Sequence, residues 1–307
     1  MPPEPMSRQR RLRRPLPEEA ELRDADQWSR RAFLAASGGF VGAATVAVVA
    51  GWPTRASATR TTALSPFVVS NDLFASSDPQ RFAFTVYRGP KPAAGPPARI
   101  ALAPPGSSRG EVLDTELDHV GLPKGRGVYY TTAVFPEPGV YKGVVLTRGK
   151  KVGLAIQVKR TPEGPVIGAP ASRAPSPTPQ DTLGVNPICT RRPQCPLHAV
   201  SLSDAIGRGR PVAVLFATPA LCQTRYCGPV LDELLDVMPA YQDRVTFVHV
   251  EIYRSNRGTR RVPTVIDWNL PFEPWLVTVD GAGIIHGRLD SAFGHDEIVN
   301  TLDALVA

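Results

Sequence analysis

The sequence predicts two domains of different class, an all-β sandwich over residues 59–160 and an α/β domain over residues 187–307. Three observations predict this organisation. Residues 62–160 contain short runs of β-branched and aromatic side chains, which proline and glycine separate. Residues 161–186 are rich in proline, serine and alanine, as is typical of a linker. Beyond this linker, apolar runs of strand length alternate with apolar residues at helical spacing, which is the pattern of an α/β fold.

The first domain is predicted to be an antiparallel sandwich, since about seven short strands at close spacing are typical of that architecture. Residues 135–141 and the two-strand run after them resemble the last hairpin of immunoglobulin-like domains in exported proteins, which implies an immunoglobulin-like sandwich. The domain has no cysteine, and its one histidine, His119, is expected at the surface, so we expect a spacer or interaction module. The strand runs are residues 65–70, 81–88, 98–103, 127–134, 140–147 and 151–159.

The linker, residues 161–186, has little to bury, so we expect it to be extended and mobile. After it, the predicted order is helix, strand, helix, strand, strand, strand, helix. The two long strands require a right-handed crossover between them, and the last two strands form a hairpin. In chain order these elements are residues 201–208, 211–217, 229–238, 244–253, 275–279, 284–289 and 296–306.

This order of elements resembles the thioredoxin fold, and three local features carry the resemblance. Cys222 follows the first long strand, near the start of the next helix. Residues 216–229, FATPALCQTRYCGP, look like the active-site region of thioredoxins. Pro274 begins the hairpin strand, where thioredoxin-like proteins carry a cis-proline. The resemblance implies that Cys222, Cys227 and Pro274 are catalytic. It also implies a cis Glu273–Pro274 peptide, beside which the backbone of Glu273 binds a substrate strand.

The chemistry of such a pair depends on a thiolate, which is the nucleophile in disulfide exchange. The start of a helix lowers the pKa of a thiol, and nearby Arg225 adds positive charge. However, four residues separate Cys222 from Cys227, where thioredoxin has two. Positions i and i+5 lie about 140° apart around a helix, so Cys222 must precede the helix for the pair to meet. Glu273, if close, would disfavour a thiolate by repulsion.

The sequence does not decide whether Cys222 or Cys227 is the attacking cysteine. The position after the strand favours Cys222, which we prefer, whereas the Cys-Gly-Pro sequence favours Cys227. Four cysteines allow three disulfide connectivities, and proximity favours Cys189 with Cys195 and Cys222 with Cys227. We expect a structural disulfide between Cys189 and Cys195 that fastens the linker to the domain. For Cys222 and Cys227, the sequence is compatible both with a redox-active pair and with an inert structural disulfide.

The first 58 residues resemble a twin-arginine export signal. A polar, arginine-rich start leads to the pair Arg30 and Arg31, a moderately apolar run follows over residues 34–52, and the segment ends in a small-residue cleavage site. An uncleaved anchor over residues 33–52 is the alternative, because a membrane span needs about 20 residues. Both interpretations place residues 59–307 outside the cytoplasm, in the cell envelope or secreted, where disulfides persist.

The charge pattern argues against nucleic acid as a partner. The formal net charge of the 307 residues is +7, and the first 58 residues hold nine arginines against six acidic residues, a difference of +3. The remaining arginines are scattered apart from residues 254–261, without an interleaved aromatic stripe. The membrane is expected as a partner only through an uncleaved leader.

No metal and no cofactor are expected from the spacing of the histidines. Sco-type copper chaperones place a histidine shortly before the hairpin strand of this fold, but residues 267–279 contain none. His249 lies in an apolar strand run, where a core histidine is more common, and His286 and His295 come later. The peroxidase pattern fails because Pro219 stands where its threonine is required.

These observations predict an exported thiol–disulfide oxidoreductase that acts on protein thiols or disulfides through its Cys-x4-Cys pair. An unidentified redox partner would recycle it. The alternative is a non-catalytic exported binding protein in which both cysteine pairs are structural disulfides. The reduction potential separates the two, since structural disulfides lie below about −300 mV.

Overall fold

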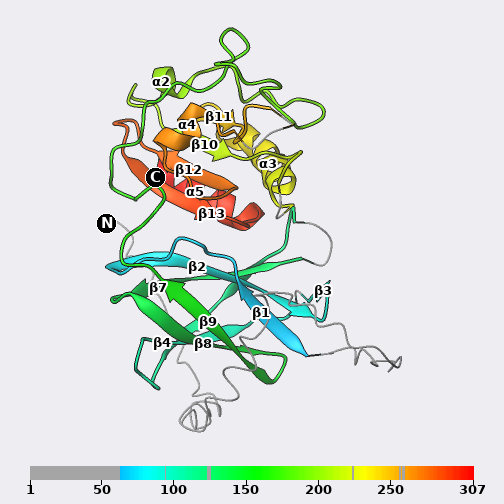
Figure 1. Ribbon diagram of the computed structural model, residues 1–307, viewed down its shortest axis with the longest axis vertical. Helices are drawn as coiled ribbons and strands as arrows, with labels where there is room; N and C mark the ends of the chain where they lie inside the picture. Colours follow the sequence, from blue (N-terminus) through cyan, green and yellow to red (C-terminus); the bar gives the residue numbers. More distant parts are fainter. Residues whose placement is uncertain (1–62, 94, 123–125, 223–224, 256, 258–259) are drawn as a thin grey trace, which may run out of the picture. The chain divides into compact units, whose positions relative to one another are not determined.

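The computed structural model describes residues 63–307, apart from residues 94, 123–125, 223–224, 256 and 258–259 (Figure 1). The described residues belong to one compact unit. The expected export signal or anchor, residues 1–58, lies outside them. Within the described part of the chain, no helix is long and apolar enough to cross a membrane.

Two antiparallel β-sheets form the first part of the chain. One has the strand order β1-β2-β7-β6, with β3 also paired to β2, and the other has the order β5-β4-β8-β9. The bounds are β1 (Leu64–Val68), β2 (Ser76–Arg88), β3 (Lys91–Pro92), β4 (Arg99–Ala103), β5 (Glu111–Asp114), β6 (Glu116–Asp118), β7 (Val128–Phe135), β8 (Gly139–Thr147) and β9 (Lys150–Val158).

One apolar cluster joins these two sheets, because their strands turn one set of side chains toward it. In β8, Tyr141 and Val145 are buried while Val140 is exposed, as the two-residue period of a strand requires. Aromatic side chains of the first sheet, among them Phe82 and Phe135, pack in the same cluster. The cluster therefore holds the sheets together as a sandwich of two layers.

All six strand runs expected in this part are confirmed as strands, with shifts of a few residues at their ends. The sequence pattern missed β3, β5 and β6. These strands have two to four residues each, and β5 and β6 read EVLD and ELD. Such short, acidic segments lack the apolar alternation that identifies a strand, and they pair because their neighbours position them.

The second part of the chain is built on a four-stranded sheet of order β11-β10-β12-β13. Strands β10 and β11 are parallel and are joined through α3, whereas β12 is antiparallel to both β10 and β13. The bounds are α2 (Leu202–Ala205), β10 (Val212–Phe216), α3 (Cys227–Val237), the 3₁₀ turn η2 (Met238–Ala240), β11 (Thr246–Val250), α4 (Pro263–Asp267), β12 (Trp275–Val279), β13 (Ile285–Asp290) and α5 (His295–Val306).

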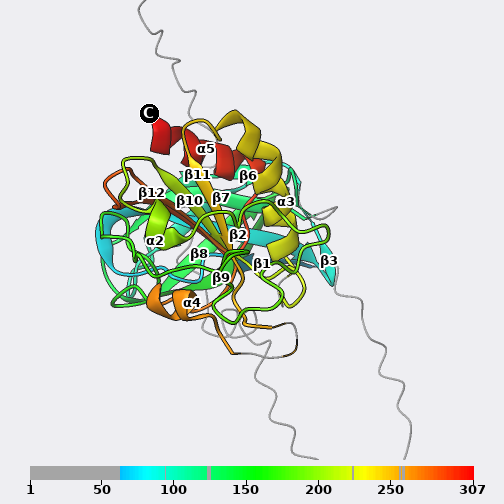
Figure 2. The ribbon, with the colours of Figure 1, turned by 90° about the horizontal axis from the view of Figure 1, so that it is seen from above.

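Strands β10 and β12 are buried on both faces, which explains their continuous apolar sequences, VAVLF and WLVTV. Ala213 and Leu215 face the cluster that contains the apolar residues of α3 and α5. Val212 and Val214 face the cluster that contains those of α2 and α4. Figure 2 accordingly shows α3 and α5 on one side of the sheet and α4 on the other. The expected elements are present, and α4 is an additional helix that the sequence pattern did not predict.

The proline-rich segment, residues 161–186, contains no helix or strand. We expected it to be mobile, but it packs along the second part of the chain. Its backbone pairs with the β12–β13 hairpin through hydrogen bonds from Gly168 to Ile285 and from Ala171 to Gly283. The Ser176 hydroxyl accepts a hydrogen bond from the N–H of Leu202, the first residue of α2. Backbone hydrogen bonds of this kind fasten a segment that has few apolar side chains.

Buried charges connect the sandwich to the second part of the chain. The Arg81 guanidinium on β2 donates to Glu297 of α5 and to Asp290 of β13, at 2.5 and 3.2 Å. It also donates to the carbonyl of Ala292. The Glu297 side chain is only 2% exposed. We call Arg81, Asp290 and Glu297 the interface cluster; its groups are satisfied only while the two parts remain in contact.

Candidate functional site

The first candidate site lies where β10 leads into α3. Cys227 is the first residue of α3 and is buried, whereas Cys222 lies before the helix and is half-buried. The backbone N–H of Cys227 points at the sulfur of Cys222, 3.3 Å away. The expectation that Cys222 must precede the helix is therefore confirmed, and the two cysteines lie together despite the four residues between them.

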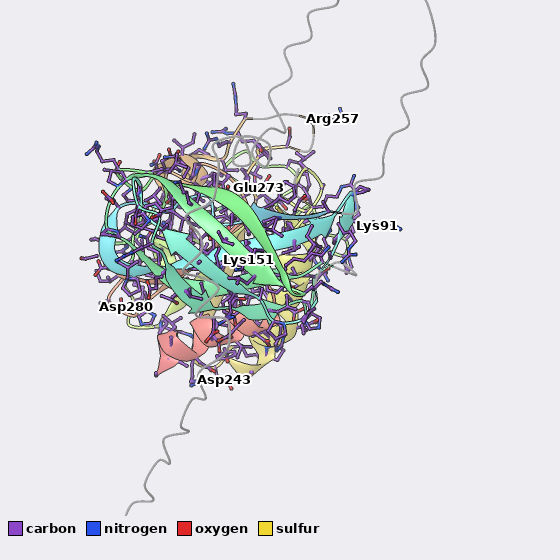
Figure 3. The ribbon with its side chains drawn as sticks, turned by 90° about the horizontal axis from the view of Figure 1, so that it is seen from below. Lys91, Lys151, Asp243, Arg257, Glu273 and Asp280 are labelled. Atoms are coloured by element: carbon purple, nitrogen blue, oxygen red, sulfur yellow. The ribbon has the colours of Figure 1, made fainter. Side chains whose placement is uncertain are left out.

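Glu273 and Pro274 complete this site from the neighbouring strand. The register pairs Phe216 at the end of β10 with Trp275 at the start of β12, so the residues before β12 lie at the carboxyl end of β10. The Glu273–Pro274 peptide is cis, as expected. Figure 3 labels Glu273 and shows it well away from Asp243, which precedes β11 and belongs to the opposite edge of this sheet. The structure thus brings together Cys222, Cys227, Glu273 and Pro274.

The carboxyl group of Glu273 contacts the buried thiol of Cys227. Its Oε2 lies 3.5 Å from Sγ of Cys227, which donates to it. Burial raises the pKa of Cys227 above its ordinary value, and the neighbouring Cys222 and Glu273 add to this rise. Burial also raises the pKa of Glu273 to about 7, with repulsion from Cys222 as the next cause. A carboxyl group with this pKa exchanges a proton readily near neutral pH.

The second candidate site gathers Cys189, Cys195, His198 and His249, all of them buried. The Sγ atoms of Cys189 and Cys195 lie 3.7 Å apart. A disulfide needs about 2.05 Å, and Cys189, Cys195, Cys222 and Cys227 are all free cysteines in the structure, so the bond expected between Cys189 and Cys195 stays a prediction that the structure does not show. Instead, Sγ of Cys195 lies 3.3 Å from Nε2 of His198 and 3.3 Å from Nδ1 of His249. The two imidazole nitrogens are 3.2 Å apart. We call these four residues the Cys2His2 cluster.

The other ring nitrogen of His249 is already engaged. Nε2 of His249 lies 3.0 Å from the carbonyl oxygen of Ala217, directly after β10. A carbonyl only accepts, so this nitrogen carries the hydrogen, and Nδ1 presents its lone pair to the cluster. Next to the cluster, the N–H of Thr190 donates to Glu251, and the Thr190 hydroxyl accepts from the N–H of Ala220. The cluster and the Cys222–Cys227 site therefore adjoin through the segment that follows β10.

The sequence pattern does not identify the histidines of this cluster. It favours a core position for His249 and does not single out His198. The signal available was the run Cys189-x5-Cys195-x2-His198, which holds two thiol donors and one imidazole donor within ten residues. The fourth donor comes from β11, 51 residues beyond His198. His286 is not part of either site, and His295 contacts Glu233.

No model of a known protein family matches the chain, and a search of curated proteins finds no relative. The function is therefore inferred from the geometry of these two sites.

Proposed function

We propose that this protein is an exported thiol–disulfide oxidoreductase whose α/β domain is thioredoxin-like and whose redox pair is Cys222 and Cys227. The observation that carries the proposal is the backbone N–H of Cys227 at the start of α3, 3.3 Å from Sγ of Cys222. A thiolate at Cys222 would accept this hydrogen bond and would lie at the positive end of a helix of 11 residues. The sheet order β11-β10-β12-β13, with α3 between parallel strands, supports the proposed fold.

Cys222 is the attacking residue in this proposal. It is half-buried and hence accessible from solvent, whereas Cys227 is fully buried. The thiolate of Cys222 attacks one sulfur of a substrate disulfide, a mixed disulfide forms, and the other substrate sulfur leaves as a thiolate. The backbone of Glu273, beside Pro274, is proposed to bind the substrate strand in this complex.

Cys227 resolves the mixed disulfide with the help of Glu273. The thiol of Cys227 has a raised pKa and needs a base, and the carboxylate of Glu273 is 3.5 Å from its sulfur. After Glu273 takes the proton, the Cys227 thiolate attacks Sγ of Cys222 and releases the reduced substrate. Two electrons pass from the cysteine pair to the substrate, and the reverse sequence oxidises a substrate dithiol. A separate redox partner returns the pair to its starting state.

The reduction potential of the pair tests this function. The full chain is equilibrated with glutathione buffers, its thiols are alkylated, and the products are digested with trypsin. Each cysteine then falls in its own peptide, because trypsin cuts after Arg191, Arg208, Arg225 and Arg244. We expect a potential between about −120 and −270 mV for Cys222 and Cys227, the range of known oxidoreductases. A potential below about −300 mV contradicts catalysis and favours the non-catalytic binding protein.

Single variants identify the attacking cysteine. Cys227→Ser is expected to accumulate a mixed disulfide with oxidised glutathione at Cys222, because the resolving thiol is missing. Cys222→Ser is expected to form little of it, and the control His286→Gln should behave as the wild type. Accumulation at Cys227 in Cys222→Ser, without accumulation in Cys227→Ser, would reverse the assignment.

A further inference from the structure

We infer that the Cys2His2 cluster is a tetrahedral zinc site: Cys189, Cys195, His198 and His249 bind one Zn²⁺ through two thiolates and two neutral imidazoles. This site is separate from the redox pair, and the inference does not depend on the proposed function. Its support comes from the distances, the charge balance and the orientation of His249.

The distances fit a common central ion. With Zn–S bonds of about 2.3 Å and Zn–N bonds of about 2.05 Å, tetrahedral angles place two sulfurs about 3.8 Å apart, sulfur and nitrogen about 3.5 Å apart, and two nitrogens about 3.3 Å apart. The structure has 3.7 Å between Cys189 and Cys195 and 3.2 Å between His198 and His249. Three of its four sulfur–nitrogen distances are 3.3, 3.3 and 4.0 Å and surround the expected value. All four ligand atoms lie within 4.8 Å of one another. If the two thiols and two imidazoles only formed a chain of hydrogen bonds, the groups at its ends could lie far apart. A shared ion requires all four ligand atoms to lie close to one another, as they do here.

The charges also balance. Zn²⁺ with two thiolates and two neutral imidazoles has no net charge, so the site can be as buried as it is, with Cys189, Cys195, His198 and His249 at 6% exposure or less. Binding releases the two thiol protons to solvent and oxidises nothing: Zn²⁺ plus two R–SH gives Zn(SR)₂ plus two H⁺. A tetrahedral S₂N₂ donor set is typical of zinc.

His249 is held as zinc ligands usually are. A ligating histidine commonly donates its other ring N–H to a carbonyl or carboxylate, which orients the ring and selects the tautomer. Here Nε2 of His249 donates to the carbonyl of Ala217, and Nδ1 faces the cluster. Because all four positions of the ion are taken by protein, the site is closed, as in structural rather than catalytic zinc sites. The ion would therefore fasten the segment 189–198 to β11 and to the end of β10.

Metal analysis of the full chain tests the site. The protein is purified with tris(2-carboxyethyl)phosphine, supplied with Zn²⁺, and freed of loosely bound metal. We expect one Zn²⁺ per chain, and a rise of roughly 10 °C in the unfolding midpoint with saturating zinc. Substitution by Co²⁺ should give the strong visible d–d bands of a tetrahedral site and a sulfur-to-cobalt charge-transfer band. This readout needs no variant and reports the ligand type directly.

Matched variants locate the ion. Cys189→Ser and His249→Gln should lose the metal and the cobalt spectrum, while Cys222→Ser and His286→Gln should keep both. The zinc site is wrong if the reduced chain holds less than one tenth of an equivalent of zinc, or if Cu⁺ binds tightly where Zn²⁺ does not. It is also wrong if Cys222→Ser abolishes binding, or if the freshly purified chain carries a Cys189–Cys195 disulfide and takes up no zinc after reduction.

Discussion

Glu273 is the residue that sets the pH dependence expected of the proposed redox site. Its pKa is raised to about 7 because it is partly buried and because Cys222 and Glu251 repel its charge. The Cys227 thiol donates a hydrogen bond to Glu273. Burial raises the pKa of nearby Tyr253, and the charge of Glu273 adds to this rise. A partly buried carboxyl group beside a buried thiol can hold the thiol proton during the proposed resolution step, which a permanently charged or permanently neutral side chain cannot do.

At this scale we predict the effect of Glu273→Gln on catalysis. In the wild type, the rate of mixed-disulfide resolution should rise as the pH increases through about 7, the pKa of Glu273. The Gln variant lacks the base, so its rate should fall by about 10²-fold at pH 7 and recover only at higher pH. Stopped-flow detection of the thiol probe that leaves the mixed disulfide measures this rate. An unchanged pH profile in the variant would exclude Glu273 as the base.

The same substitution has a predicted effect on stability. The pKa of Glu273 is raised from 4.5 to about 7 in the folded chain, so the folded state favours the protonated form. The stability that this proton contributes is complete below pH 4.5 and is lost as the pH rises through about 7. Relative to the wild type, Glu273→Gln should therefore gain stability between pH 4.5 and pH 8. Urea unfolding at both pH values checks the sign, and a relative loss would contradict it.

Helix α3 positions Cys227 beside Cys222 by packing its apolar face on the sheet. Leu231 and Leu234 are fully buried in the same apolar cluster as Leu215 of β10 and Phe293, and the helix that they anchor begins at Cys227. The polar face carries Asp232 and Asp236, as expected of an amphipathic helix at the surface of a sheet. The N–H of Cys227 can reach Cys222 only while this helix is docked.

At the scale of the element, truncation of the buried face should be costly. Leu231→Ala removes a side chain of 0% exposure, so we expect a loss of about 2–5 kcal/mol in the free energy of unfolding. The matched control is Ile266→Ala in α4, since Ile266 is 60% exposed and its truncation should change stability by less than about 0.5 kcal/mol. Chemical denaturation measures both, and similar losses for the two variants would contradict the assigned burial.

The interface cluster acts at the scale of the whole molecule. Arg81 lies on β2, and its partners Asp290 and Glu297 lie more than 200 positions later in the chain. Burial of Glu297 raises its pKa and the charge of Arg81 lowers it, so the carboxylate depends on its partner. The pKa of Asp72 shifts in the opposite direction: burial raises it, but the backbone N–H of Glu163, the charge of Arg288 and the backbone N–H of Gly164 together hold it below the ordinary value.

Arg81→Met should weaken this junction, because it leaves two acidic groups buried without their cation. We expect a loss of about 3–5 kcal/mol in the free energy of unfolding, as is typical when one partner of a buried ion pair is removed. Lys142→Met, at an exposed position of β8, serves as the control and should stay within about 0.5 kcal/mol of the wild type. A cost below about 1 kcal/mol for Arg81→Met would show that solvent reaches the cluster.

By itself the sequence determined the local structure of this protein. Periodic apolar residues and turn residues predicted the six longer strands of the sandwich and the main helices and strands of the second part, because each such signal lies within a short stretch of chain. It also placed Cys222 before a helix and Pro274 before a strand. The short strands β3, β5 and β6 and the helix α4 were not predicted, because they are too short for their apolar residues to show a helical or strand period.

Only the tertiary structure decided which distant groups meet. His249 comes 60 residues after Cys189 and 54 after Cys195, and no local pattern connects them. The parallel pairing of β10 and β11 places His249 beside Leu215, with its ring against the carbonyl of Ala217. The pairing of β12 with β10 brings Glu273 to Cys227. The same long-range packing turned an expected linker into an ordered segment. Contacts of this kind depend on the register of strands far apart in the chain, which residue types and spacing do not encode locally.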